Sequence, residues 1–500
     1  MLCDLATKKA WREIVPEPLW RPSADRIADA NITAFARQLE SDWGVALPDY
    51  PSLHAFSLNE MEKFWSTVWD FCGVVAETKG ERILLDGDRM PGAKFFPDAR
   101  LNFAENLLGR RDDSPAIIFR AEDMFKRQLT WNELYDEVSR LAQAMRALGV
   151  ESGDRIAGFV PNCPEAIIAM LAASSIGAIW TSCSPDFGIQ GVLDRFGQVE
   201  PKILFTADGY YYNGKALDSL GKISDVLADL PSVQMTIVFP LLTEDPAIGG
   251  VPNATHWRHF IAAHDAGDIE FAQLPFDHPL YILYSSGTTG APKCIVHGAG
   301  GTLLQHLKEQ RLHCDIKSGD RAFYFTTCGW MMWNWLVSFL ASDVTVVLFD
   351  GSPSYPGPDV LFDYVDAAEV NLFGTSAKFI DALGNAGLKP METHDLSSVR
   401  TITSTGSPLV PEGFDYVYQD VKKDVCLSSI AGGTDIVGCF VGGNPTLPVW
   451  RGEIQCKLTG MAADVFDDDG NAVIGEKGEL VCTKPFPSMP VGFWNDPDGK

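Results

Sequence analysis

The nine residues from Ser285 to Lys293 have the types and spacing that suit phosphate binding. They read SSGTTGAPK and combine four hydroxyl side chains, two glycines and one lysine. Glycine backbones can bring their N–H groups close to an anion, the hydroxyls add donors, and Lys293 adds a positive charge. Ala291 and Pro292 separate Gly290 from Lys293, so the spacing is not that of the Gly-Lys-Ser/Thr nucleotide loop. The predicted phosphate-binding residues here are Ser285, Ser286, Gly287, Thr288, Thr289, Gly290 and Lys293.

The elements around this loop argue that it is held rather than mobile. The apolar run from Leu280 to Tyr284 predicts a buried strand before it, and Thr302 to Leu312 has leucines at helical spacing after it. A mobile surface loop is the alternative that composition alone would favour. A preceding strand, a terminal lysine and a second glycine pair at 300–301 favour the phosphate loop.

Two further segments follow predicted strands. STGSP (404–408) comes after VRTITS, and SSIAGGTDI (428–436) comes after VCL. In the second, the glycines permit close approach, the Thr434 hydroxyl can bond a phosphate oxygen, and the Asp435 carboxylate suits Mg²⁺. The alternatives are a strand-to-helix turn for the first and a glycine turn with a helix N-cap for the second. A third segment, CGWMMWNW (328–335), would by itself be ordinary core.

Strands and helices alternate through most of the chain. Strand patterns near 116–119, 155–160 and 202–207 flank helical patterns at 131–148 and 164–176, and a second alternating unit follows the phosphate loop. The pattern predicts an α/β fold with two doubly wound, mostly parallel-sheet subdomains. A helical N-terminal extension and a small β-rich subdomain would flank them. The boundaries that we predict are 1–105, 106–278, 279–451 and 452–500.

Composition narrows the class of protein. With 46% apolar and 21% charged residues, the chain has an ordinary globular composition. A formal charge of −26 argues against nucleic acid or an anionic membrane as partner. Eleven cysteines without a CxxC pair indicate free thiols in a reducing compartment, and the longest apolar runs are too short to span a bilayer. We therefore expect a cytoplasmic protein.

At this point the motifs resemble a known family. YSSGTTGAPK resembles the phosphate-loop signature of the adenylate-forming enzymes, which comprise acyl-CoA synthetases, luciferases and peptide-synthetase adenylation domains. The segments 326–341, 428–445 and 478–500 resemble the acetoacetyl-CoA synthetase branch in particular. This resemblance covers nearly the whole chain, and the first 105 residues are similar to the N-terminal extension of short-chain acyl-CoA synthetases.

The resemblance implies a role for each segment. Lys293 and Thr434 would be catalytic, with Thr434 on the α-phosphate and Asp435 on Mg²⁺ in place of the more usual glutamate. Gly432 stands where acetyl-CoA synthetases have a tryptophan, which implies room for an acid larger than acetate. The resemblance implies a nucleotide site of Gly406, Ser407, Pro408, Ser429, Ile430, Ala431, Gly432, Gly433 and Thr434. It implies an acyl site of Trp330, Met331, Met332, Thr405 and Gly432.

These roles predict an ATP- and Mg²⁺-dependent ligase that joins acetoacetate to CoA through an acetoacetyl-adenylate. A ligase for another short acid and a non-catalytic nucleotide-binding regulator are the alternatives. In this family a mobile small domain follows the large one, and its transition-state lysine would lie beyond Lys500. We expect the 500-residue chain to fold and bind nucleotide but to turn over slowly.

Overall fold

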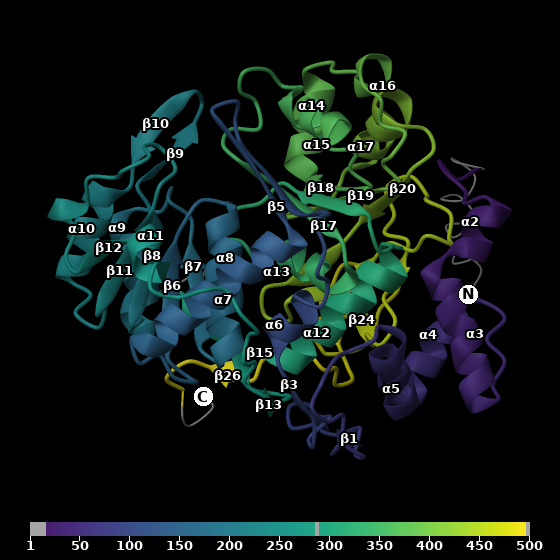
Figure 1. Ribbon diagram of the computed structural model, residues 1–500. Coiled ribbons are helices and arrows are strands. Elements are labelled where there is room, and N and C mark those ends of the chain that lie inside the picture. The colour runs from purple at the N-terminus through teal and green to yellow at the C-terminus, as the bar shows by residue number, and fades with distance from the viewer. Residues whose placement is uncertain (1–16, 286–289, 497–500) are drawn as a thin grey trace.

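The computed structural model describes residues 17–285 and 290–496 (Figure 1). Four residues of the predicted phosphate loop, Ser286, Gly287, Thr288 and Thr289, lie outside the described residues. Two large sheets dominate the described part, and the prediction of a mixed α/β fold with parallel sheets is confirmed.

The first sheet has eight strands in the order β12-β11-β8-β6-β7-β14-β15-β26. Its strands run parallel from β12 to β14, and β15 and β26 are antiparallel to their neighbours. The run predicted from Leu280 to Tyr284 is the buried centre of β14. The strands are β6 (Arg155–Phe159), β7 (Ile179–Cys183), β8 (Ile203–Ala207), β11 (Met235–Phe239), β12 (Ala254–His256), β14 (Pro279–Ser285), β15 (Lys293–Gly298) and β26 (Gly492–Phe493).

The second sheet has seven strands in the order β20-β19-β18-β16-β17-β4-β5, all parallel to their neighbours except β5. β4 and β5 precede the first sheet in the chain, whereas β14 and β15 follow residue 278 and belong to the first sheet. Each sheet therefore contains strands from both sides of the predicted boundary at 278/279. The strands are β4 (Pro115–Ala121), β5 (Phe125–Thr130), β16 (Arg321–Tyr324), β17 (Thr345–Asp350), β18 (Leu372–Ser376), β19 (Thr401–Thr405) and β20 (Cys426–Ser429).

Helices cover both sheets. α7 begins with a capping box, in which the Thr130 side chain accepts from the Glu133 N–H and the Glu133 side chain accepts from the Thr130 N–H. α8 is buried on nearly every side, as its uniformly apolar sequence requires. α7 (Trp131–Ala147) packs against α8 and against β4 and β5. The first sheet is accompanied by α8 (Pro164–Ile176), α9 (Ile189–Val199), α10 (Leu220–Ala228) and α11 (Trp257–Ile261), and the second by α14 (Val360–Ala367), α15 (Ala377–Asn385), α16 (Pro390–Thr393), α17 (Pro411–Tyr416) and η4 (Val417–Val421).

The helix after β15 leads into the region of the site. α12 (Ala299–Leu307) continues without a break as the π-helical segment η2 (Lys308–His313), and every residue of α12 is buried. α13 (Met331–Val337) and the 3₁₀ segment η3 (Ser338–Ser342) follow β16 and are also almost wholly buried. The predicted helix over 302–312 is thus confirmed, and it lies deep in the molecule.

The N-terminal region forms a helical layer on one side of the molecule (Figure 1). It contains α2 (Ala24–Asp29), α3 (Asn31–Trp43), α4 (Tyr50–Asn59) and α5 (Met61–Phe71). Phe64, Trp65 and Val68 of α5 are fully buried, so the aromatic face of this helix is core. Glu60 adopts a non-helical conformation and separates α4 from α5.

Short antiparallel strands complete the chain. β21 (Ala431–Gly433), β22 (Gly438–Gly442) and β23 (Cys456–Lys457) form one small sheet, and β24 (Ala463–Phe466) pairs with β25 (Glu479–Cys482). The remaining elements are β1 (Leu84–Leu85), β2 (Lys94–Phe95), β3 (Arg100–Leu101), α6 (Phe103–Leu107), β9 (Gly209–Tyr212), β10 (Lys215–Asp218), η1 (Ile248–Gly250) and β13 (Leu274–Pro275).

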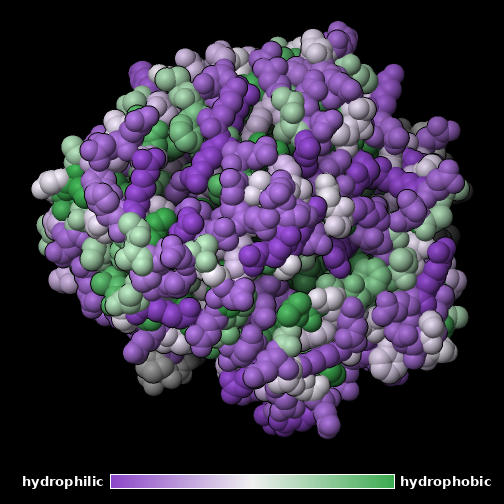
Figure 2. Space-filling view, in the orientation of Figure 1, coloured by the Kyte–Doolittle hydropathy of each residue, from purple (hydrophilic) through white to green (hydrophobic). Residues whose placement is uncertain are grey.

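The visible surface is largely hydrophilic, with hydrophobic side chains scattered over it (Figure 2). Ten cysteines in the described part of the chain are free thiols, and eight of them are buried. None of the helices within the described ranges combines the length and the apolar character that a membrane span requires.

Candidate active site

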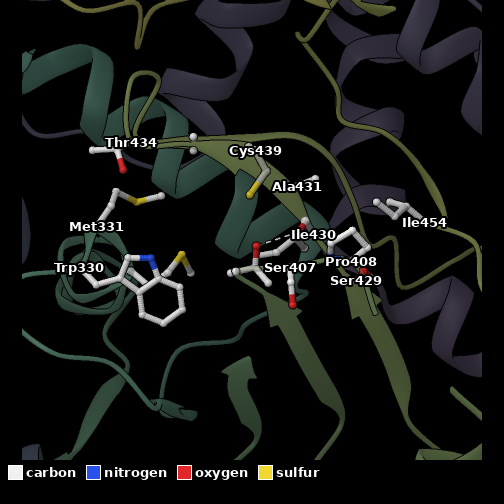
Figure 3. A pocket seen from close by; sticks show the side chains of 16 residues that line it. Trp330, Met331, Ser407, Pro408, Ser429, Ile430, Ala431, Thr434, Cys439 and Ile454 are labelled. Carbon is white, nitrogen blue, oxygen red and sulfur yellow. Dashed lines mark hydrogen bonds between the residues drawn. The ribbon is translucent and has the colours of Figure 1, made fainter. Parts of the chain in front are cut away.

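A cavity of about 340 Å³ lies beyond the carboxyl ends of β19 and β20, between α13 and the β21–β22 hairpin (Figure 3). Ligand sites of α/β sheets lie at this edge because loops after neighbouring parallel strands meet there. The cavity is lined by Trp330, Met331, Met332, Thr405, Gly406, Ser407, Pro408, Ser429, Ile430, Ala431, Gly432, Gly433, Thr434, Gly438, Cys439 and Ile454. The predicted acyl residues and the predicted residues of the nucleotide segments therefore share one cavity.

Hydrogen bonds between the ends of β19 and β20 fix the base of the cavity. The Thr405 hydroxyl donates to the Ile430 carbonyl at 2.9 Å, and the Ile430 N–H donates to the Ser404 carbonyl at 2.9 Å. Gly406 then turns the chain at φ 89°, in the left-handed region that favours glycine. Ser407 and Pro408 follow along the cavity wall.

The start of α13 forms a second wall. Trp330 is the N-cap residue, half-buried, and its ring packs edge-on against Tyr324 with centroids 5.8 Å apart. Met331 and Met332 follow, both buried. The Trp330 indole N–H makes no hydrogen bond to any residue that the structure describes, so it is available to a ligand in the cavity.

The β21–β22 hairpin forms the third wall. Gly432 pairs with Cys439 and Gly433 with Gly438, and Thr434 lies in the turn between the strands. A Cβ atom on Gly432 would come 1.9 Å from the Gly438 carbonyl oxygen. Glycine is thus required for the close approach of the two strands, whatever its effect on the volume of the cavity.

The described ends of the phosphate loop lie on paired strands. Ser285 ends β14 opposite Lys293, which begins β15, and Gly290 has φ 111°. The exposed Lys293 ammonium lies 5.7 Å from the Phe493 ring centroid and forms no ion pair with the described residues. Neither Ser285, Gly290 nor Lys293 lines the cavity around Thr434.

Asp435 follows Thr434 in the hairpin turn and is exposed. Its carboxylate makes no hydrogen bond or ion pair with the described residues, and it does not line the cavity. Within those residues no cluster of three or more His, Cys, Asp or Glu side chains could hold a metal. A single free carboxylate next to Thr434 is nevertheless of a kind that fits Mg²⁺, which proteins often hold through one or two carboxylates together with substrate phosphates.

Two buried groups beside the hairpin, His297 and Cys439, are neutral. Burial lowers the pKa of His297, which lies beside the Thr434 backbone, to about 3. Burial, together with the nearby Glu309 carboxylate, raises the pKa of the Cys439 thiol well above its usual value. Cys439 is therefore a protonated, weakly polar lining group rather than a nucleophile.

Three lining residues were not predicted: Gly438, Cys439 and Ile454. The first two could have been predicted from a hairpin, because a four-residue turn after Gly433 places Gly438 and Cys439 opposite the predicted glycines. Ile454 comes from an irregular loop before β23 and has no such signal.

Comparison with known proteins identifies the family of the chain. The family model described as "AMP-binding enzyme" matches residues 103–491, and a model of the acetyl-coenzyme A synthetase N-terminus matches residues 50–107. The chain belongs to the AMP-binding enzyme family. The acetoacetyl-coenzyme A synthetase of Rhizobium meliloti is 56% identical, over 96% of this chain and 74% of the relative.

Two further relatives bear on this assignment. The solved acetoacetyl-CoA synthetase from Streptomyces lividans superimposes with a TM-score of 0.91 at 45% identity, covering 97% of this chain and 75% of that one. The malonamoyl-CoA synthetase of Penicillium aethiopicum is 40% identical over 93% of this chain and 69% of its own length. The AMP-binding enzyme family thus includes relatives of this chain that are named for two different acyl groups.

Proposed function

We propose that this chain is an ATP-dependent acetoacetate–CoA ligase. The acetoacetate carboxylate attacks the α-phosphorus of ATP, forming acetoacetyl-AMP and releasing pyrophosphate. The CoA thiolate then attacks the acyl carbon and AMP leaves, giving acetoacetyl-CoA. A carboxylate needs this activation because its own leaving group would be oxide, whereas AMP departs readily from the mixed anhydride.

The observation that carries the proposal is the single cavity of about 340 Å³ beyond β19 and β20. Met331 and Met332 supply apolar surface, Ser407 and Pro408 supply a separate strip, and Thr434 stands at the hairpin turn. An acyl-adenylate has an acyl group, an adenosine and a phosphate joined in a chain. Holding all three in one cavity would position the acyl carboxylate next to the α-phosphorus before the attack, which lowers the entropic cost of the reaction.

The residues have distinct proposed roles. The Thr434 hydroxyl has no hydrogen bond to the described residues and would donate to an α-phosphate oxygen, where charge builds up in the transition state. The Lys293 ammonium, which forms no ion pair with the described residues, would hold the β- and γ-phosphates together with Ser285, Gly290 and the rest of the loop. Gly406, Ser407 and Pro408 would lie along the adenine.

Mg²⁺ is part of the proposal, with Asp435 as its protein ligand. When bound, the ion would neutralise triphosphate charge. Asp435 would provide one carboxylate oxygen, and the remaining ligands would be water and phosphate oxygens.

Two features favour a 3-oxo acid as the acyl substrate. The acetoacetyl and malonamoyl groups named for the relatives both carry a carbonyl at carbon 3. The free Trp330 N–H lines the cavity and would donate a hydrogen bond to that carbonyl oxygen. A simple alkanoic acid has no acceptor at this position.

The experiment is a binding and turnover panel. Titration calorimetry with 5′-O-(acylsulfamoyl)adenosines, which mimic acyl-adenylates, would compare acetyl, propionyl, butyryl, 3-hydroxybutyryl and acetoacetyl groups, and pyrophosphate release would follow the free acids with ATP and Mg²⁺. We expect acetoacetyl to lead by tenfold or more, about 1.4 kcal/mol. Another acid in the lead would make the chain a ligase for that acid, and nucleotide binding without acyl preference or turnover would favour a regulator.

A further inference from the structure

Two buried side chains on the helix behind the cavity each bond to both of its facing walls. His306 lies near the end of α12, and Glu309 lies about one helical turn later, on η2. The His306 Nε2 atom lies 2.7 Å from the Val437 carbonyl oxygen in the hairpin turn, and its Nδ1 atom lies 2.7 Å from the Ser338 hydroxyl of η3. His306 therefore connects the hairpin to the end of α13.

Glu309 makes the same connection one turn further along. Its Oε1 atom accepts the Cys439 backbone N–H at 2.7 Å, and its Oε2 atom accepts the Trp335 indole N–H at 2.9 Å. Gln305 donates a third hydrogen bond, to Oε1, at 2.8 Å. Cys439 lines the cavity, and Trp335 lies on α13, which supplies Met331 and Met332 to the opposite wall.

The hairpin backbone is tightly constrained at these contacts. Val437 has φ 49°, a left-handed conformation that is strained for a β-branched residue, and its carbonyl is the one that His306 holds. A Cβ on Gly438 would come 2.7 Å from the Glu309 Oε1 atom. A change in either buried side chain is thus transmitted to the hairpin backbone.

We propose that Glu309 and His306 are positioning residues that set the distance between the hairpin wall and the α13 wall, and thereby the length of acyl group that the cavity admits. The inference rests on the proposed function for what occupies the cavity. A wall that shifts by a fraction of an ångström matters, because one methylene too many or too few changes discrimination by about 10- to 200-fold.

The first test is Glu309→Gln. Glutamine keeps the size of the side chain but has one oxygen. In either orientation its NH₂ group would face an N–H donor of one of the two walls, so the hydrogen bond to that wall would be lost. We expect the affinity ratio between acetoacetyl- and 3-oxohexanoyl-sulfamoyladenosine to change at least tenfold. Affinity for AMP should stay within about twofold of the original value.

Glu122→Gln is the matched control. Glu122 is also fully buried and also accepts three N–H bonds, from Asn213, Gly214 and Ser352, none of which lines the cavity. It should lower the melting temperature without changing the acyl ratio. Equal ratios in Glu309→Gln, Glu122→Gln and the original chain would overturn the proposal and leave Glu309 a structural residue.

A milder variant covers the case in which Glu309→Gln does not fold. Trp335→Phe removes one N–H from the α13 side and leaves the carboxylate and its bond to Cys439 in place. It should shift the acyl ratio in favour of the longer group by about threefold or more, and an unchanged ratio would contradict the proposal. Failure of the proposed function is seen separately, as an absence of acyl preference in the original chain.

Discussion

Gly432 and Gly438 sit so close across the β21–β22 hairpin that a Cβ atom on Gly432 would come within 1.9 Å of the Gly438 carbonyl oxygen. The same Cβ would come 2.6 Å from the Cys439 Cα atom. Both obstacles are backbone atoms of β22, which cannot rotate away as a side chain could. The geometry of the hairpin, and not only the size of the acyl group, thus depends on this glycine.

We therefore predict that Gly432→Ala weakens binding of every acyl-sulfamoyladenosine by about tenfold or more and lowers the free energy of unfolding by about 1–3 kcal/mol, the usual cost of overpacking. Calorimetric titration and denaturant unfolding would measure the two effects. Gly250→Ala is the control, because its Cβ would meet open space. A stable Gly432→Ala protein that merely prefers acetate would show that the side chain enters the cavity.

Trp330→Phe separates hydrogen bonding from packing in the acyl site. Because the indole N–H has no partner among the described residues, its loss should weaken binding of the acetoacetyl mimic by about 0.5–1.5 kcal/mol more than binding of the butyryl mimic. The smaller ring also loses packing, such as that against Tyr324, but this cost is common to both mimics. Trp333→Phe is the control, since that indole N–H is buried, has no partner and lies outside the cavity. Equal losses for both mimics would exclude the hydrogen bond.

Much of the fold could be predicted because its signals are local. Periodicity located β14, α7 and α8, since each carries its own apolar pattern and α7 also has a capping box. The pairing of β4 with β17 could not be predicted, because the two strands are more than two hundred residues apart and nothing local distinguishes one parallel neighbour from another. The break between α4 and α5 could not be predicted either, because Glu60 interrupts a pattern that is apolar on both sides.

The lining of the cavity could be predicted where residue type and position after a strand stand out. Glycines, hydroxyls and Thr434 stand out after strands, whereas Cys439 and Ile454 line the cavity only because of how their strand and loop return to it. Nothing in the sequence indicates that His306 and Glu309 lie behind the cavity. A polar residue within a predicted helix is normally expected on its surface, and only packing reveals that these two are buried.

Asp435→Asn tests the proposed metal ligand. The amide keeps the shape of the side chain but removes the charge, so the Mg²⁺ concentration needed for half-maximal ATP–pyrophosphate exchange should rise by about 10–100-fold. Addition of EDTA should abolish the exchange in the original chain. Asp468→Asn, on the exposed turn after β24, is the control and should leave the Mg²⁺ dependence unchanged. An Asp435→Asn protein with ordinary Mg²⁺ dependence would place the ion elsewhere.

The buried His306 predicts a pH-dependent contribution to stability. Burial lowers its pKa from an ordinary value of 6.5 to about 4, although the bond to the Val437 carbonyl opposes the shift. Between pH 6.5 and 4 the unfolded chain therefore binds a proton at this position that the folded chain does not. The contribution of His306 is fully present above pH 6.5 and is lost as the pH falls, at up to about 1.4 kcal/mol per pH unit.

The comparison of His306→Gln with the original chain isolates this contribution from opposing groups such as Asp350, whose pKa burial raises to about 7. Glutamine can donate to Val437 and accept from Ser338 but does not titrate. The stability advantage of the original chain over His306→Gln, measured by urea unfolding, should be constant from pH 8 to 7 and decline from pH 6.5 to 4.5. A constant difference would mean that the buried imidazole gains its proton in the folded state as readily as in the unfolded one.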